Sequence, residues 1–201
     1  MAQAVEMGLP VPETIVTNSP EDARIFLSAS PQSSVFKVLT GARFFFADTR
    51  RITADHYDFL DALEFAPIIL QREVEDKRDI RATVIDDEVF AAEIVPNHQG
   101  ARLDWRLDAS ASVLAHRLPD SVSDSLVLLV RRLGLRYGAI DLALRSDGCY
   151  VFLEINPGGQ FLFAEIHAGL PISTALARAL LKNETPNLLK KESATPATTK
   201  T

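Results

Sequence analysis

YGAIDLALRSDGCYVFLEINP, residues 137–157, predicts two β-strands joined by a tight turn at Asp147-Gly148. With those two residues as the turn, Asp141 lies directly opposite Glu154, and Asn156 lies on the same face of the hairpin. The same register forms apolar pairs, which are Ile140 with Ile155, Leu142 with Leu153 and Leu144 with Val151. A shift of one residue would exchange the two faces, so the pattern specifies the register.

Two carboxylates that face each other on neighbouring strands repel, so Asp141 and Glu154 need a compensating partner. A hard divalent cation is the simplest one, because Mg²⁺ takes one or two carboxylate ligands and leaves its other positions to water and phosphate. The run EINPGGQ, residues 154–160, favours this interpretation, since two oxygen-bearing side chains precede a glycine-rich turn. A solvated pair of surface acids and a pair that shares one proton are the alternatives, and spacing alone does not separate them.

The composition is that of a well-packed globular chain. Its 201 residues suit one domain or two small subdomains with a shared cleft, and 47% of them are apolar against 24% charged. The net charge of −6 argues against a nucleic-acid partner, which usually requires a basic surface. No apolar run approaches the roughly 20 residues of a membrane span, and no signal peptide is evident. Cys149 is the only cysteine, which is typical of a cytoplasmic protein.

Strands and helices alternate irregularly along the rest of the chain. The patterns predict strands at 14–17, 35–39, 44–46, 66–74, 79–85 and 89–95, and helices at 20–30, 53–64, 120–133 and 173–181. Residues 96–119 are polar and irregular and receive no assignment. The tail from about Thr185 has little to bury and is expected to be disordered. Hairpins outnumber regular strand–helix–strand units, which predicts an α+β fold with largely antiparallel sheets.

Lys37 is an isolated lysine inside the apolar run Val35–Leu39. One interpretation places it at the edge of a sheet, where its stem extends along apolar surface and its ammonium group reaches water. The other interpretation places its charge at a phosphate group. The residues themselves leave both interpretations open.

The chain resembles the ATP-grasp superfamily of carboxylate ligases, and within it the microviridin-type, or graspetide, enzymes that cross-link ribosomally made peptides. The resemblance covers about Glu6 to Leu181 and is carried by residues 8–14, 37, 69–74, 77–81, 104–106, 138–141 and 153–163. It implies the ATP-grasp fold, in which two α/β subdomains with largely antiparallel sheets grip a nucleotide cleft. The N-terminal subdomain is expected at 1–70, the C-terminal subdomain with the metal site at 71–184 and the disordered tail at 185–201.

The resemblance also implies a role for each matching residue. The family's Mg²⁺ ligands correspond to Asp141, Glu154 and Asn156, where Mn²⁺ is a second candidate ion. The nucleotide-binding positions correspond to Lys37 at the phosphates, Gln71, Glu73 and Val74 at the adenine, and Asp79 at the ribose. The catalytic positions correspond to Arg81 and Arg106, near the γ-phosphate or the acyl phosphate.

The activity that the resemblance implies is an ATP-dependent carboxylate ligation that forms ADP. A carboxylate attacks the γ-phosphate to give an acyl phosphate, and an amine or hydroxyl then displaces phosphate. The implied substrate is a precursor peptide with a leader, whose Asp or Glu side chains are joined to Ser, Thr or Lys side chains. The alternatives are a non-catalytic module that binds nucleotide or leader peptide, and a ligase that acts on free amino acids.

Two features depart from the family's pattern. Members normally carry an N-terminal α/β domain, and this chain begins at about the point where that domain would end. We therefore expect the chain to be a fragment, a split subunit or a degenerate paralogue. As partners we expect a second copy of the chain, or another subunit that supplies the domain. The glycine-rich loop that follows the strand lysine in the family is represented here only by Thr40–Arg43, which contains one glycine.

Overall fold

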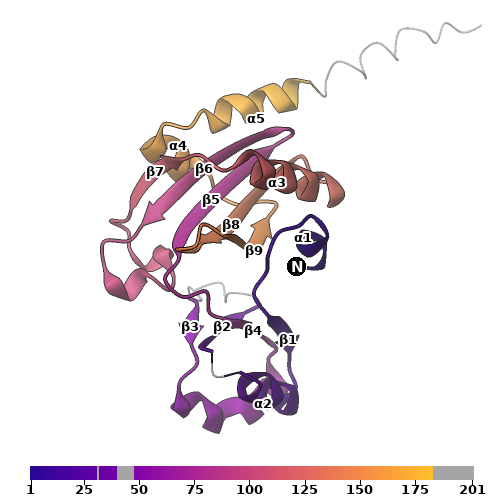
Figure 1. The fold of residues 1–201 in the computed structure, drawn as a ribbon, viewed down its shortest axis with the longest axis vertical. Coiled ribbons are helices and arrows are strands. Elements are labelled where there is room, and N and C mark those ends of the chain that lie inside the picture. Colours follow the sequence, from indigo (N-terminus) through magenta and orange to yellow (C-terminus); the bar gives the residue numbers. More distant parts are fainter. Residues whose placement is uncertain (31, 40–47, 183–201) are drawn as a thin grey trace, which may run out of the picture.

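The computed structural model describes residues 1–30, 32–39 and 48–182, which form two antiparallel sheets (Figure 1). The smaller sheet has the order β1-β4-β2-β3 and consists of β1 (Thr14–Thr17), β2 (Ser34–Val38), β3 (Arg50–Arg51) and β4 (Ile68–Arg72). The larger sheet has the order β7-β6-β5-β8-β9 and consists of β5 (Arg78–Ile85), β6 (Glu88–Val95), β7 (Ser112–His116), β8 (Tyr137–Leu144) and β9 (Tyr150–Asn156). The predicted α+β class with antiparallel sheets is confirmed. The predictions for 40–46 and for the tail lie outside the described residues.

Helices α2 (Pro20–Ser28) and η1 (Ala54–Phe65, a 3₁₀ helix) cover one face of the smaller sheet. The Ser19 hydroxyl caps α2 by accepting the Asp22 N–H at 3.2 Å, and Pro20 occupies the first helical position. Phe26 of α2 and Leu70 of β4 belong to the buried cluster between these helices and the sheet. This core fixes the strands that carry the cleft residues.

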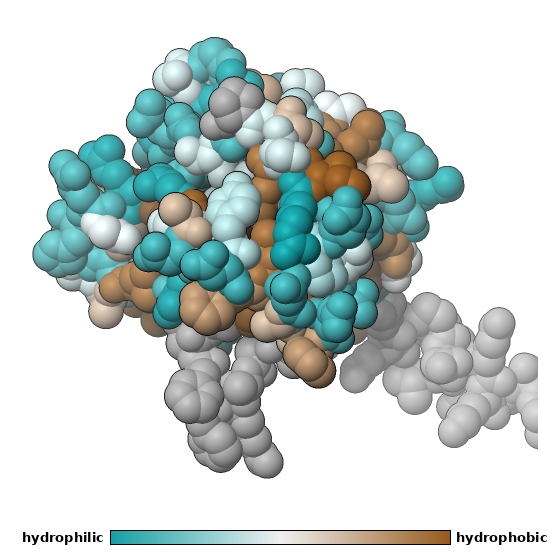
Figure 2. Space-filling view, turned by 90° about the horizontal axis from the view of Figure 1, so that it is seen from below, coloured by the Kyte–Doolittle hydropathy of each residue, from teal (hydrophilic) through white to brown (hydrophobic). Residues whose placement is uncertain are grey.

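The end of the molecule that holds the smaller sheet presents a mixed surface. Figure 2 shows hydrophilic side chains over much of this face, with apolar patches between them. Phe59 and Phe65 of η1 are 71% and 89% exposed, and Val16 and Ile25 are also exposed. Helix η1 therefore buries only part of its apolar side chains against the sheet.

The larger sheet is buried on both faces, because its strands alternate between two cores. Ile80, Ala82 and Val84 point to one core, which is covered by α1 (Ala2–Glu6) and α3 (Asp120–Arg132). Ile85 and Ala92 point to the other core, beneath α4 (Leu162–Ala168) and α5 (Ile172–Leu181). No helix in the described ranges is long and apolar enough to cross a membrane.

The hairpin of β8 and β9 has the predicted register only at the end away from the turn. Asp141 lies opposite Glu154 as predicted, but Leu142 lies opposite Phe152 rather than Leu153 and, by the same shift, Leu144 lies opposite Tyr150 rather than Val151. The reason is a three-residue loop, with Gly148 at a φ of 84°, in place of the predicted two-residue turn. A bulge beside Asp141 then takes up the extra residue and restores the facing acids.

Residues 96–119, which the sequence patterns did not assign, contain η2 (Gln99–Ala101), η3 (Trp105–Leu107) and β7. Side-chain bonds rather than periodicity order this segment. Both carboxylate oxygens of Asp108 accept hydrogen bonds, from the N–H groups of Asn97, His98 and Ser110 and from the Ser110 hydroxyl. The Ser110 hydroxyl and these N–H groups lower the pKa of Asp108 to about 2.

Candidate active site

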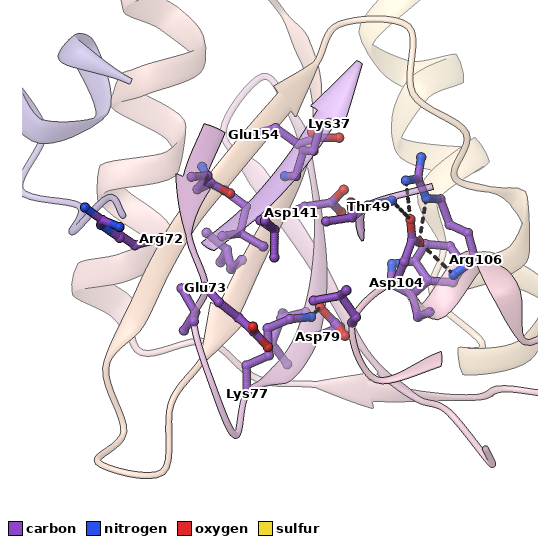
Figure 3. Close-up of a pocket in the computed structure, with 18 residues that line it drawn as sticks. Lys37, Thr49, Arg72, Glu73, Lys77, Asp79, Asp104, Arg106, Asp141 and Glu154 are labelled. Atoms are coloured by element: carbon purple, nitrogen blue, oxygen red, sulfur yellow. Dashed lines mark hydrogen bonds and ion pairs between the residues drawn. The ribbon is translucent and has the colours of Figure 1, made fainter. Parts of the chain in front are cut away.

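A pocket lies between the two sheets and collects residues from both of them (Figure 3). The smaller sheet contributes Lys37 on β2, and the larger sheet contributes Asp141 and Glu154. Eight of the ten predicted site residues line this pocket: Lys37, Gln71, Glu73, Val74, Asp79, Arg106, Asp141 and Glu154. The remaining two, Arg81 and Asn156, are not among its lining residues but lie on the same strands as Asp79 and Glu154.

The facing acids are not equivalent. Arg81 donates from Nε to Asp141 at 2.6 Å, and its side chain is only 11% exposed. Burial raises the pKa of Asp141, Arg81 acts in the opposite direction, and Glu154 adds to the increase. Glu154 is exposed at the pocket. Arg81 therefore offsets part of the repulsion between the two acids and leaves Glu154 open to a ligand.

The donor set fits a cation that keeps ligands from outside the protein. Two carboxylates and the Asn156 amide lie on one face of the hairpin, and a carboxylate that accepts from Arg81 retains further lone pairs. In the described part of the chain, no three His, Cys, Asp or Glu side chains are grouped to hold an ion by themselves. A small set of oxygen donors completed by water and phosphate is the preference of Mg²⁺.

The loop after β9 is held by side chains that bond to its backbone. Asn156 Oδ1 accepts the Gly158 N–H at 2.9 Å, and the Gly159 carbonyl accepts the Tyr137 hydroxyl at 2.5 Å. The Gln160 carbonyl accepts a bond from Arg81 at 3.1 Å. These bonds hold the glycine pair against the strand that carries Asp141.

The two glycines of this loop predict opposite outcomes for the same substitution. A Cβ atom on Gly159 would lie 2.4 Å from the Ala139 Cβ, whereas the nearest atom to one on Gly158 is 3.8 Å away. We expect Gly159→Ala to lower the free energy of unfolding by roughly 1–3 kcal/mol, because β8 cannot move aside. Gly158→Ala is the matched control and should stay within about 0.5 kcal/mol of wild type. Equal urea midpoints for the two variants would contradict this reading of the loop.

The cations of the pocket sit among acids. Burial lowers the pKa of the Lys37 ammonium, while Glu154 and Asp141 act in the opposite direction. Lys77 forms an ion pair with Asp79, and both side chains are 11% exposed. Burial raises the pKa of Asp79, and Lys77 opposes that increase. Lys37 thus lines the pocket within the electrostatic reach of the two facing acids, and its role at a phosphate group stays a prediction.

At the end of β4 and in the segment that follows it, the side chains of Gln71 and Glu73 are already bonded within the protein. Gln71 donates from its side chain to the Thr14 hydroxyl at 2.9 Å, and the Glu73 carboxylate accepts two bonds from Arg51, at 2.7 and 2.5 Å. The Glu73 carbonyl accepts from Gln32 Nε2 at 2.9 Å. The Val74 N–H has no hydrogen-bond partner among the described residues. Because Val74 also lines the pocket, its backbone N–H can bond to a ligand there.

Asp104 is one of the pocket residues to which the sequence assigned no role. It is 5% exposed and bonds to Arg106 through both carboxylate oxygens, at 2.7 and 2.5 Å. The available signal was the spacing, since an Asp two residues before its partner is typical of a turn in which the side chain accepts a local N–H. The neighbouring Trp105 also lines the pocket, with one face against Phe163.

Comparison with solved structures finds ATP-grasp ligases. The macrocyclase MdnC of Microcystis aeruginosa, bound with its precursor peptide MdnA, matches 89% of this chain at 32% identity and a TM-score of 0.77. A RiPP-associated ATP-grasp ligase of Chryseobacterium gregarium, in complex with ADP and a leader and core peptide, matches 91% at 29% identity and a TM-score of 0.78. The ligase PsnB, complexed with a minimal precursor, matches 92% at 31% identity and a TM-score of 0.76.

The chain spans 58% of the length of each of these three structures. Other PsnB structures hold Mg with ADP, or AMPPNP. D-cycloserine synthetase DcsG matches at 21% identity and a TM-score of 0.65, which indicates a shared fold. Neither a protein-family model nor a curated protein sequence matches the chain. The resemblance to peptide-modifying ATP-grasp ligases is therefore confirmed by structure.

Proposed function

The chain has the ATP-grasp fold, and from this premise we propose that it acts in the ATP-dependent ligation of side-chain carboxylates of a ribosomally made peptide. One observation carries the proposal. A single pocket between the two sheets unites Lys37 from the smaller sheet with Asp141 and Glu154 from the larger one. A nucleoside triphosphate and its metal require positive charge and oxygen donors in one pocket, and this pocket contains both.

Different residues of the pocket bind different parts of ATP. Val74 meets the adenine through its backbone N–H, and the apolar side chains of Val35, Leu142 and Leu153 line the same pocket. Lys37 contributes its positive charge at the phosphates. Placing these groups on two sheets lets the cleft orient the nucleotide without a covalent step, which suits phosphoryl transfer.

The metal set consists of Asp141, Glu154 and Asn156. A bound Mg²⁺ would offset the charge of the phosphates and orient them. Arg81 holds the Asp141 carboxylate at 2.6 Å and so fixes one donor, while exposed Glu154 remains available. Arg106 lies at the pocket beside these acids, where its charge can stabilise the γ-phosphate as it moves to the substrate carboxylate.

The proposal of a peptide substrate is based on the comparison structures. Two of them contain a precursor peptide, and one contains a leader and core peptide. In the proposed reaction a side-chain carboxylate takes the γ-phosphate and leaves ADP, and an amine or hydroxyl of the peptide then displaces phosphate. The product is an amide or an ester. A homodimer, a second subunit, Mn²⁺ as the ion and a cytoplasmic location stay predictions.

The test begins with calorimetric titration of ATP into the wild-type chain, with and without Mg²⁺. We expect binding that depends on the metal, because the two acids alone repel the phosphates. Peptides that contain Glu or Asp together with Lys, Ser or Thr are then incubated with ATP and Mg²⁺. The expected result is ADP release and a peptide lighter by one water for each bond formed.

Free amino acids form the comparison arm. ADP release with glutamate but not with the peptides would move the proposal to a small-molecule ligase. Metal-dependent binding without ADP release in either arm would favour a nucleotide-binding module. A well-folded chain that binds no ATP would overturn the proposal.

A further inference from the structure

Asp104 bonds to residues on both sides of the pocket, one next to the smaller sheet and one in the segment beside the larger sheet. One of its oxygens accepts the Thr49 N–H at 3.0 Å, and Thr49 directly precedes β3 of the smaller sheet. Asp104 itself lies on the segment that precedes η3, beside the larger sheet. Figure 3 shows the three residues Thr49, Asp104 and Arg106 joined by these bonds at one side of the pocket. The contact spans 55 positions of the sequence.

The same carboxylate fixes Arg106. Arg106 donates from Nε to one oxygen at 2.7 Å and from an Nη to the other at 2.5 Å, and its backbone N–H also bonds at 3.2 Å. A bidentate pair of this kind sets the plane of the guanidinium as well as its position. Burial opposes the ionisation of Asp104, but the bonds from Arg106 and Thr49 hold its pKa below the usual value. Asp104 therefore stays charged at the pocket wall.

We propose that Asp104 is a positioning residue that links the smaller sheet to Arg106. Its carboxylate joins the Thr49 amide to the Arg106 guanidinium, so the position of the arginine at the pocket is tied to that of the smaller sheet. The inference rests on the proposed function, because it assigns Arg106 to the phosphate that is transferred. It adds a condition to that function, namely that Arg106 is held at the pocket by a carboxylate that also bonds the smaller sheet.

Asp108 offers a matched control. It is buried to the same degree, 6% exposed against 5% for Asp104, and lies in the same segment. Its partners, Asn97, His98 and Ser110, belong to that segment as well. Asp108→Asn should therefore lower stability without affecting the smaller sheet. Asp104→Asn keeps the size of the side chain and one acceptor oxygen, and Asp104→Ala removes both acceptors.

The direct measurement is the exchange rate of the Thr49 amide hydrogen, followed by NMR on the full chain without ligand. In Asp104→Ala we expect about tenfold faster exchange than in wild type, since the N–H loses its acceptor. Asp104→Asn should fall between the two, and Asp108→Asn should match wild type at Thr49. Exchange of Thr49 in Asp104→Ala within about twofold of wild type would overturn the link.

A second measurement tests the effect on Arg106. Titration of AMPPNP and of ADP, each with Mg²⁺, gives the preference for the nucleotide that carries a γ-phosphate. We expect this preference to fall about tenfold in Asp104→Ala and to be unchanged in Asp108→Asn. An unchanged preference in Asp104→Ala would refute the positioning of Arg106. If wild type binds neither nucleotide, the proposed function fails, whereas the ligand-free exchange rate still decides the link to Thr49.

Discussion

Removing both facing carboxylates, in the double variant Asp141→Asn/Glu154→Gln, is expected to weaken the binding of ATP in the presence of Mg²⁺ by about 100-fold. The two acids lie directly opposite each other at the pocket and are the charged members of the predicted metal set. The amide groups of the variant keep the shape of the side chains but carry no negative charge. The measurement is calorimetric titration at several Mg²⁺ concentrations, where the metal dependence should disappear.

Two further variants separate metal binding from folding. Arg81 is largely buried against Asp141, so the double variant leaves a buried guanidinium without its counter-charge and loses stability as well. Glu154→Gln alone avoids this loss, because Glu154 is exposed. Asp147→Asn is the matched control on the same hairpin, since Asp147 lies in the turn and is half exposed. Unaltered metal dependence in Glu154→Gln and in the double variant would exclude these acids as ligands.

The sequence predicted the acid pair because it depends on local periodicity. Alternation with period two places Asp141 and Glu154 on one face, and the apolar pair of Ile140 and Ile155 anchors that end of the hairpin. Near the turn the same reasoning was wrong, since a two-residue turn and a three-residue loop with Gly148 require the same residue types. The bulge beside Asp141 cancelled the error at the position that matters for the site.

Other parts of the site depend on contacts between distant segments. Asp104 meets Thr49 across 55 positions, and Glu73 meets Arg51 across 22. No local pattern encodes such pairs, because their partners are chosen by the packing of the two sheets. Arg106 could be assigned from a resemblance, and the spacing of Asp104 offered a local signal for its bond to Arg106, but the contact of Asp104 with Thr49 could be recognised only from the structure. The same holds for β7, which follows a segment ordered by the bonds to Asp108.

The largest effect on stability is expected from Arg72→Met. Arg72 is 3% exposed and donates to Glu13 at 3.0 Å, to the Ser34 hydroxyl at 2.9 Å and to the Phe26 carbonyl at 2.6 Å. Its guanidinium also lies 4.2 Å from the centre of the Phe26 ring. Methionine fills similar space but removes the bond to the Ser34 hydroxyl, and it leaves the Phe26 carbonyl with only the longer bond from the Ala29 N–H at 3.3 Å. We expect the free energy of unfolding to fall by about 3 kcal/mol, measured by urea denaturation.

Arg24→Met is the control that isolates burial from charge. Arg24 pairs with Asp61 at 2.7 Å, but the two side chains are 45% and 81% exposed. An exposed pair of this kind contributes about 0.5 kcal/mol, so the control should lie close to wild type. Arg72 joins β4 to α2 and precedes Glu73, so its loss should also loosen the segment that carries Val74. Equal losses in the two variants would mean that the buried bonds of Arg72 do not hold the smaller sheet together.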